Sequence, residues 1–311
     1  MSLSTRPLLI GTRGSPLALW QARHVMARLA AIHGLAEEAV ALKVIITSGD
    51  RVRDRPLRDF GGKGLFTKEI DEALLDGAID LAVHSMKDLP THLPEGIAVA
   101  AVLPRADVRD AFISAKARSL ADLPQGAVIG TSSLRRAAQV RRYRPDLRVV
   151  DFRGNVETRL KKLGDGQADA TLLALAGLER LGLAGHVTSV LSTDEMLPAV
   201  AQGAIGTTCR NDDAKTRALL EPLNDSASAA AVACERAFLA SLDGSCKTPI
   251  AGLAELEKDL MRFRGLILTP DGTEWFETQT TDAAERAVTI GTEAGEALLA
   301  RAGPSFIASL V

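Results

Sequence analysis

Short apolar segments alternate with helix-like segments along the first part of the chain. The run 8–11 is apolar, Ser15 and Pro16 are residue types that begin a helix, and Gly34 is typical of a helix end. A second helix is predicted to open at Thr67, and further apolar strands are predicted over 44–47, 79–83 and 97–103. Continuous apolar strands separated by helices are typical of a mainly parallel sheet covered on both faces.

The same alternation restarts after Pro104. Either Ser132 or Ser133 is expected to cap an arginine-bearing helix, and strands are predicted over 127–130, 147–152 and 171–175. The rhythm changes beyond an Ala-rich helix predicted over 227–242. Strand-like segments then flank a turn at Asp271-Gly272, and a last helix is predicted over 282–299. The pattern predicts an α/β protein with two lobes and a small C-terminal α+β domain.

The segment 48–64 has no clear periodicity and is rich in Arg, Asp and Gly. Long irregular segments of this kind often act as lids over a site, but a solvated surface loop has the same composition. Both interpretations stay open from the sequence alone.

The overall composition is that of a globular protein without a membrane segment. The chain has 311 residues, of which 46% are hydrophobic and 24% charged, and its only apolar run near the N-terminus, 8–10, is too short for a signal-peptide core. The three cysteines form no CxxC pair and the five histidines no ligand spacing, so we expect no disulfide and no metal. A reducing, cytoplasmic setting is therefore expected.

The formal net charge of −2 conceals a strongly basic stretch. Residues 131–162 hold ten Lys or Arg against three Asp or Glu, which indicates an acidic partner, either a nucleic acid or a small polyanion. Binding to single-stranded nucleic acid usually needs interleaved aromatic side chains, and this stretch has only Tyr143 and Phe152. A small anionic ligand is therefore favoured over a nucleic acid.

Three groups of residues are candidates for chemistry. Cys246 lies in a polar turn beside Lys247, whereas Cys209 and Cys234 lie in apolar surroundings, so Cys246 is the cysteine expected to be reactive. An ordinary unreactive thiol remains an alternative for it. Lys87 and Asp88 follow an apolar strand, where they form either a buried ion pair or a catalytic pair.

The third group consists of arginines at strand-to-helix turns, where backbone N–H groups already favour anions. Such arginines suit a ligand rich in carboxylates, because a guanidinium binds a carboxylate through two parallel hydrogen bonds. The set is Arg13 with Ser15, Arg135 and Arg136 after Thr131 and Ser133, and Arg153 with Arg159. Another set, Arg141, Arg142, Arg144 and Arg148, is interpreted as exposed helix charges.

Together these segments resemble the hydroxymethylbilane synthases (porphobilinogen deaminases) over nearly the whole chain. The matching strings are TRGSPLAL (12–19), GGKGLF (61–66), VHSMKD (83–88), GTSSLRR (130–136), RGNV (153–156), TRL (158–160), AGL (176–178), QGA (202–204), GSC (244–246) and PI (249–250). Each string alone is weak, but their common order along the chain is specific to this family.

The resemblance implies a fold of two type II periplasmic-binding-protein-like lobes around a cleft, with a C-terminal domain that carries the cysteine. The implied boundaries are 1–103 with 204–221 for lobe 1, 104–203 for lobe 2, and 222–311 for the C-terminal domain. It also implies an enzyme that joins four porphobilinogen molecules head to tail, with loss of ammonia, to give hydroxymethylbilane. The implied primer is a covalent dipyrromethane cofactor. Separately, the lack of an obvious exposed apolar stripe in the sequence favours a monomer.

The resemblance also implies a role for individual residues. Asp88 matches the catalytic acid, and Cys246 matches the cysteine that carries the cofactor through a thioether. Arg13, Ser15, Arg153, Arg159 and Arg180 match residues that hold the acetate and propionate groups of the substrate. Lys87, Thr131, Ser133, Arg135 and Arg136 match residues around the cofactor, and Lys63 and Phe66 match lid residues.

The sequence departs from the family pattern at Ala201, Ser245 and Asp59, which bears on loop and lid detail rather than on the reaction.

Two other functions remain to be tested. A two-lobed module that only binds a small polyanion needs no reactive cysteine in a third domain. A nucleic-acid-binding protein would lose affinity steeply as the salt concentration rises.

Overall fold

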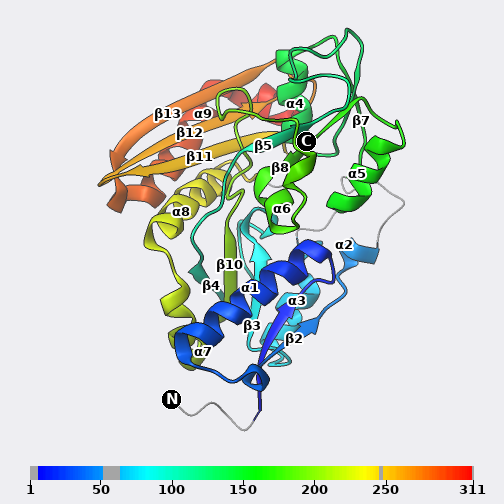
Figure 1. The fold of residues 1–311 in the computed structure, drawn as a ribbon. Coiled ribbons are helices and arrows are strands. Elements are labelled where there is room, and N and C mark those ends of the chain that lie inside the picture. Colours follow the sequence, from blue (N-terminus) through cyan, green and yellow to red (C-terminus); the bar gives the residue numbers. More distant parts are fainter. Residues whose placement is uncertain (1–5, 52–63, 245–247, 310–311) are drawn as a thin grey trace. The chain divides into compact units, whose positions relative to one another are not determined.

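The computed structural model describes residues 6–51, 64–244 and 248–309, which form two compact units. One unit contains residues 1–105 and 204–229, and the other contains 106–203 and 230–311. Three separate sheets are present (Figure 1). None of the described helices is long and apolar enough to cross a membrane.

The first unit is built on a five-stranded sheet. Its strands, in spatial order, are β2 (Val40–Val44), β1 (Leu8–Thr12), β3 (Leu81–Ser85), β10 (Ile205–Arg210) and β4 (Ile97–Val102). β1 is parallel to β2 and β3, whereas β10 is antiparallel to both of its neighbours. The sheet is mixed rather than wholly parallel because β10 enters it only after the chain has passed through the second unit.

Helices cover this sheet through two apolar clusters. Helix α1 (Pro16–His33) buries Val25 and Leu29 against Ile10 and Leu81, together with α7 (Ala214–Leu220). Helix α3 (Lys68–Leu75) buries Ile70 and Leu74 in the other cluster. Ser15 and Gly34 cap α1 as the sequence predicts, and Gly34 has the left-handed conformation that ends many helices.

The second unit repeats the same strand order. Its strands are β7 (Arg148–Val150), β6 (Val128–Gly130), β8 (Ala170–Ala174), β5 (Asp110–Ile113) and β9 (Ser189–Val190), with helices α4 (Leu134–Tyr143), α5 (Val156–Gly164) and α6 (Leu175–Arg180). Again one strand, β5, is antiparallel to both neighbours. In each lobe the antiparallel strand directly follows a crossover from the other lobe. The two type II periplasmic-binding-protein-like lobes of the predicted fold are therefore present.

The C-terminal part of the second unit is a three-stranded antiparallel sheet with two helices. The strands are β11 (Ile250–Glu257), β12 (Leu260–Leu268) and β13 (Trp275–Ala283), and the helices are α8 (Ser226–Ser241) and α9 (Ala287–Ser309). Phe238 of α8 packs on Phe263 of β12 with ring centroids 4.9 Å apart. This is the predicted α+β domain, although the division into three domains at the stated boundaries stays a prediction.

Several element boundaries differ from the sequence prediction. The strand expected over 44–47 is found at Val40–Val44, and the last helix begins at Ala287 because β13 continues to Ala283. Ser133 is the residue that precedes α4, while the hydroxyl of Ser132 accepts a hydrogen bond from the backbone N–H of Phe152 at 2.9 Å. In the predicted lid, Ser48–Arg51 forms the short helix α2, and residues 52–63 lie outside the described residues.

The turn between β12 and β13 packs against helix α4, and this overturns one prediction. Arg141 donates a hydrogen bond to the carbonyl oxygen of Pro270 at 2.6 Å. Arg142 pairs with Glu277 at 2.5 Å and lies over the ring of Trp275 at 4.2 Å. The interpretation of these arginines as exposed helix charges was wrong, because the sequence pattern of α4 does not reveal the sheet that covers it.

The interpretation was also wrong for Arg144, which pairs with Asp146 at 2.7 Å and donates to the carbonyl oxygens of residues 120, 121 and 123. Arg148 is exposed, as expected.

The contact between the turn and α4 gives a test of the packing. Gly272 has a φ of +76°, and a Cβ atom there would lie 2.5 Å from the carbonyl oxygen of Ala138. Replacing Gly272 by Ala should lower the free energy of unfolding by about 2–4 kcal/mol, from backbone strain plus overpacking. Gly126 has a similar φ of +75° with nothing within 4 Å, so Gly126→Ala should cost only about 1 kcal/mol. Urea unfolding of both variants measures the difference, and equal losses would mean that the turn does not pack closely on α4.

Candidate functional site

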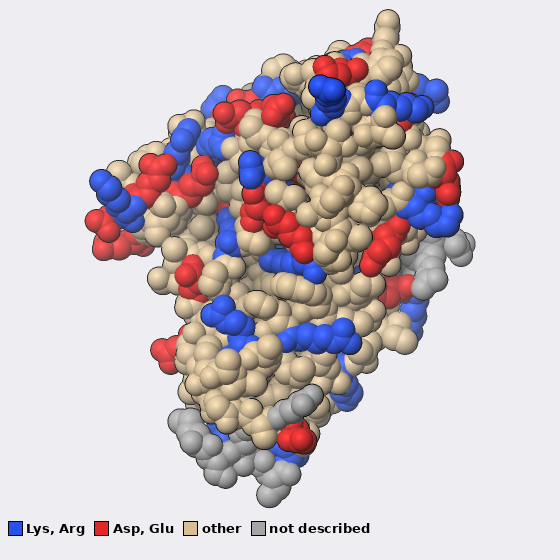
Figure 2. All heavy atoms as spheres, viewed as in Figure 1, with Lys and Arg blue, Asp and Glu red and all other residues tan. Residues whose placement is uncertain are grey.

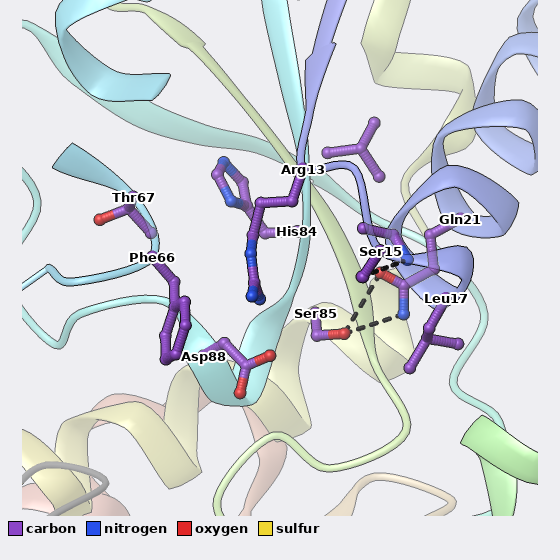
Figure 3. A pocket seen from close by; sticks show the side chains of 11 residues that line it. Arg13, Ser15, Leu17, Gln21, Phe66, Thr67, His84, Ser85 and Asp88 are labelled. Atoms are coloured by element: carbon purple, nitrogen blue, oxygen red, sulfur yellow. Dashed lines mark hydrogen bonds between the residues drawn. The ribbon is translucent and has the colours of Figure 1, made fainter. Parts of the chain in front are cut away.

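A pocket in the first unit lies at the carboxyl ends of β1 and β3. Arg13 and Ser15 follow β1, whereas His84, Ser85 and Asp88 lie at and beyond the end of β3. Phe66, which precedes α3, also lines the pocket, and its ring and the Arg13 and Asp88 side chains point toward the same space (Figure 3). Ligands of open α/β sheets bind at this position relative to the strands.

Arg13 is held in place by two contacts. Its Nη2 and Nε donate to the two carboxylate oxygens of Asp50, at 2.5 and 3.2 Å, and its guanidinium lies 4.1 Å from the centroid of the Phe66 ring. Burial alone would raise the pKa of Asp50, but the bonds from Arg13 and Thr47 lower it below its ordinary value. A charged, oriented guanidinium is therefore presented to the pocket before any ligand arrives.

Polar groups line the opposite side of the pocket. Ser15 is the N-cap of α1, and its hydroxyl accepts a hydrogen bond from the backbone N–H of Ala18 at 3.3 Å. Gln21, one turn further along α1, donates to the hydroxyl of Ser85 at 2.8 Å (Figure 3). The pocket can therefore offer hydrogen bonds to a polar ligand from two directions.

Asp88 and His84 differ sharply in their surroundings. Asp88 is exposed in the pocket and has no ion pair or hydrogen bond to another described residue, so the structure does not support a buried pair with Lys87, which is half-buried. Burial, together with the charge of Arg13, lowers the pKa of His84 to about 4. Its Nε2 lies within hydrogen-bond distance of the Thr208 hydroxyl oxygen, at 3.1 Å. At neutral pH His84 is therefore uncharged, and Asp88 is the acid that lines the pocket.

The second unit carries another group of the predicted residues at the carboxyl ends of β6 and β7. Thr131 follows β6 and is buried, and its hydroxyl accepts a hydrogen bond from the N–H of Ser133 at 3.2 Å. Ser133 precedes α4 without a side-chain cap of its own, so its hydroxyl is not used to cap the helix. Arg135 and Arg136 follow in the first turn of α4.

Arg135 and Arg136 both bind one buried carboxylate, that of Asp110. Nη2 of Arg135 lies 2.7 Å from Oδ2 of Asp110, and Nη2 of Arg136 lies 2.7 Å from Oδ1. Both arginines are at most 5% exposed, and Asp110 is fully buried. Burial alone would raise the pKa of Asp110, but the two guanidiniums outweigh it and hold that pKa well below its ordinary range.

The remaining predicted arginines of this unit are also oriented by protein acceptors. Arg153 pairs with Asp151 at 3.2 Å, and Nε of Arg159 donates to the carbonyl oxygen of Gly154 at 2.8 Å. Nη2 of Arg180 donates to the carbonyl oxygen of Gly203 at 2.6 Å, and burial lowers the pKa of Arg180 to about 10, which leaves it charged at neutral pH. All three residues are half-buried.

The structure thus groups Arg13, Ser15, Phe66 and Asp88 in one unit, and Thr131, Ser133 and the other arginines in the second. Cys246 and Lys63 lie outside the described residues. Sequence reasoning missed the acids that hold the arginines, Asp50 and Asp110, as well as Gln21. The only local signal for Asp110 was an acid directly before an apolar strand.

Two family models match the chain. One, described as "Porphobilinogen deaminase, dipyromethane cofactor binding domain", matches residues 8–218. The other, described as "Porphobilinogen deaminase, C-terminal domain", matches residues 229–300. Together they cover most of the sequence, including both lobes and the C-terminal sheet.

Curated relatives give the same result at high identity. A porphobilinogen deaminase of Paracoccus denitrificans is 57% identical over 300 residues, which are 96% of each chain. One from Nitrobacter winogradskyi is 57% identical over 297 residues, covering 96% of this chain and 94% of the relative. A chloroplastic porphobilinogen deaminase of Pisum sativum is 58% identical over 311 residues, covering 98% of this chain and 84% of the relative.

A buried acid next to the pocket gives a testable pH dependence. Asp71 of α3 is 4% exposed, and burial raises its pKa from 3.8 to about 6. Since the folded state binds this proton more tightly than the unfolded chain, the stabilisation is complete below about pH 4 and is lost as the pH rises through about 6. Asp71→Asn should therefore unfold at a higher temperature than the wild type at pH 7.5, with a smaller difference at pH 5.

Thermal unfolding at the two pH values measures this effect. Asp76→Asn, which removes the same charge from an exposed position at the end of the same helix, is the matched control and should show no such difference. If Asp71→Asn changed the unfolding temperature equally at pH 5 and pH 7.5, the raised pKa of Asp71 would be contradicted.

Proposed function

Because the chain belongs to the porphobilinogen deaminase family, we propose that it joins four porphobilinogen molecules head to tail, releasing ammonia, to give hydroxymethylbilane. The observation that carries this proposal is a single accessible carboxylate, Asp88, in a pocket whose wall presents the oriented guanidinium of Arg13. A substrate with carboxylate side chains and a developing positive charge needs both groups.

Asp88 is proposed as the catalytic residue. As the bond between the substrate's methylene carbon and its amine breaks, positive charge develops on the pyrrole, and a new carbon–carbon bond then forms while the attacked pyrrole loses a proton. The Asp88 carboxylate accepts a hydrogen bond from the pyrrole N–H and offsets the positive charge, which Arg13 would otherwise oppose. We also propose that Asp88 passes a proton to the departing amine.

The arginines are proposed to hold the substrate's carboxylates. Each pyrrole brings two of them, and a growing chain is therefore strongly anionic. Arg13 and Ser15 are proposed to bind these groups in the first unit, and Arg153, Arg159 and Arg180 in the second. A protein acceptor orients the guanidinium of each of these arginines, which supports this role.

The proposed cofactor is a dipyrromethane attached to Cys246, and when bound it supplies the end to which the first substrate unit is joined. Lys87, Thr131, Ser133, Arg135 and Arg136 are proposed to hold it. Their chemistry fits an acidic group. Two guanidiniums share one carboxylate, and the buried Nε of Arg135 has no hydrogen-bond partner among the described residues. Lys63 and Phe66 are proposed as lid residues.

We further propose that the protein acts as a monomer in the cytoplasm. Cys209 and Cys234 are buried thiols, which suits a reducing compartment. The rival function of nucleic-acid binding receives little support from the surface. On the face shown in Figure 2, Lys and Arg are interleaved with Asp and Glu, and the described residues there form no continuous basic surface.

The cofactor assignment can be tested by mass. Protein purified from cells that make porphobilinogen should be heavier than its sequence by one dipyrrole, and Cys246→Ser should lack this addition, because an alcohol replaces the nucleophilic thiolate. Cys209→Ser and Cys234→Ser are the matched controls and should keep it. Intact mass spectrometry makes the comparison. A wild-type chain of unmodified mass would refute the assignment and favour a module that only binds anions.

The role of Asp88 can be tested with Asp88→Asn, which keeps the shape and removes the charge. Turnover should fall by about 10²–10³ or more, as for the loss of one preorganised electrostatic group, while substrate affinity falls much less because the arginines remain. Asp88→Glu should keep part of the rate, limited by displacement of the charge. Glu95→Gln, at an exposed position, is the matched control.

The measurement is ammonia release in a single turnover, with each variant loaded with cofactor beforehand. Near-normal release by Asp88→Asn would show that Asp88 has no catalytic role.

A further inference from the structure

Asp110 is a fully buried carboxylate of the second unit that accepts four hydrogen bonds from described side chains. Its Oδ2 accepts a hydrogen bond from Nη2 of Arg135 at 2.7 Å. Its Oδ1 accepts bonds from Arg136, through Nη2 at 2.7 Å and Nε at 3.2 Å, and from Nε2 of Gln202 at 2.9 Å. All four residues are at most 5% exposed, so these bonds are made without competition from solvent.

The two guanidiniums are fixed in orientation by this carboxylate and by one carbonyl group. Nη1 of Arg135 donates to the carbonyl oxygen of Leu197 at 2.7 Å. Gln139 holds the backbone of Leu197 through two hydrogen bonds. Its Nε2 donates to the Leu197 carbonyl oxygen at 3.0 Å, and its Oε1 accepts from the Leu197 N–H at 2.8 Å. Arg135 therefore has two of its nitrogens committed, whereas its buried Nε has no partner among the described residues.

Such an arrangement is poorly suited to stability alone. Two buried cations with one buried anion leave an excess positive charge, and a buried donor without a partner is a cost that packed apolar residues would not incur. Groups of this kind persist where a ligand completes them. The excess charge and the open N–H point to an anionic group, which is the chemistry that the proposed cofactor carries.

Gln202 connects this carboxylate to the crossover that leaves the second lobe. Besides Asp110, its Nε2 donates to the carbonyl oxygen of Val108 at 2.8 Å. The next residue, Gly203, has a φ of +85°, and a Cβ there would lie 2.6 Å from the carbonyl oxygen of Ala106. The carbonyl oxygen of Gly203 is also the acceptor for Arg180. Gln202 is therefore held where two irregular segments, 106–108 and 202–203, pack closely, next to the acceptor of Arg180.

We propose that Asp110 is a positioning residue for the proposed cofactor-binding arginines, Arg135 and Arg136, and that Gln202 holds the Asp110 carboxylate in register. This inference rests on the proposed function, because the arginines matter for the reaction only if they hold the cofactor. Asp110 itself need not touch the cofactor or the substrate. Its effect is to fix two guanidiniums in one direction before the cofactor is assembled.

The test compares Asp110→Asn and Asp110→Glu with the wild type as full-length chains from cells that make porphobilinogen. Asp110→Asn should reduce the fraction of chains that carry the dipyrrole, by intact mass, about tenfold or more. In the chains that are loaded, kcat should fall about tenfold to a hundredfold while KM for porphobilinogen stays within about twofold, because Arg13 and Ser15 are untouched. Asp110→Glu keeps the charge and should restore part of both losses.

All measurements are made well below the unfolding temperature of each variant, so that a loss of stability alone does not change them. Arg148→Gln, which removes an exposed arginine from the same lobe, is the matched control and should load and turn over normally. A folded Asp110→Asn protein with wild-type loading and wild-type kcat would overturn the proposal. So would equal losses in Asp110→Asn and Asp110→Glu that follow only their unfolding temperatures.

If the Asp110 variants do not fold, a variant of Gln202 tests the proposed positioning of the Asp110 carboxylate. Gln202→Met keeps the length of the side chain and removes its donors, so that loading should fall about threefold to tenfold in a folded protein. Normal loading of Gln202→Met would then overturn the proposal. A wild-type chain without a dipyrrole would instead refute the proposed function, whereas a loaded wild type with unaffected variants refutes only the role of Asp110.

Discussion

The ion pairs between Asp110 and the two arginines of helix α4 are the interaction on which the second lobe depends. Moving even one guanidinium out of water costs several kcal/mol, and a second buried cation nearby makes the cost larger. The two hydrogen-bonded pairs at 2.7 Å offset that cost only because the carboxylate is held between them. Since Asp110 begins β5, the strand that enters the sheet after the crossover, the same contact fixes the strand and the helix together.

Weaker contacts of the same kind orient the other arginines that we propose to bind carboxylates. Arg13 is held by Asp50 and Phe66, Arg153 by Asp151, and Arg159 and Arg180 by carbonyl oxygens. Each acceptor orients a guanidinium through part of its fork. A site built in this way has already lost the rotational freedom of its long side chains, so that less of the binding energy is spent on ordering them.

Asp88 differs from the acids that hold these arginines, because none of the described arginines is paired with it. It is the accessible carboxylate of the first-unit pocket, whereas Asp50 is committed to Arg13 and the nearby His84 is uncharged. In the proposed reaction the Asp88 side chain faces the positive charge that develops on the substrate. The contrast between acids committed to arginines and one exposed acid supports the catalytic role that we propose for Asp88.

The local features of this protein follow from its sequence. They are the alternation of strands and helices, the caps of α1 at Ser15 and Gly34, and the strand-to-helix turns that carry Arg13, Arg135 and Arg153. These depend on residues close together in the chain, whose periodicity and backbone preferences can be read directly. Tertiary structure alone decided which acceptors those arginines meet. Asp50 is 37 residues from Arg13, Asp110 is 25 from Arg135, and Gln202 is 92 from Asp110. The same holds for the contacts of Arg141 and Arg142 with the C-terminal sheet and its turn. No periodicity connects such positions, because the fold brings them together only when the chain returns to a sheet after a crossover.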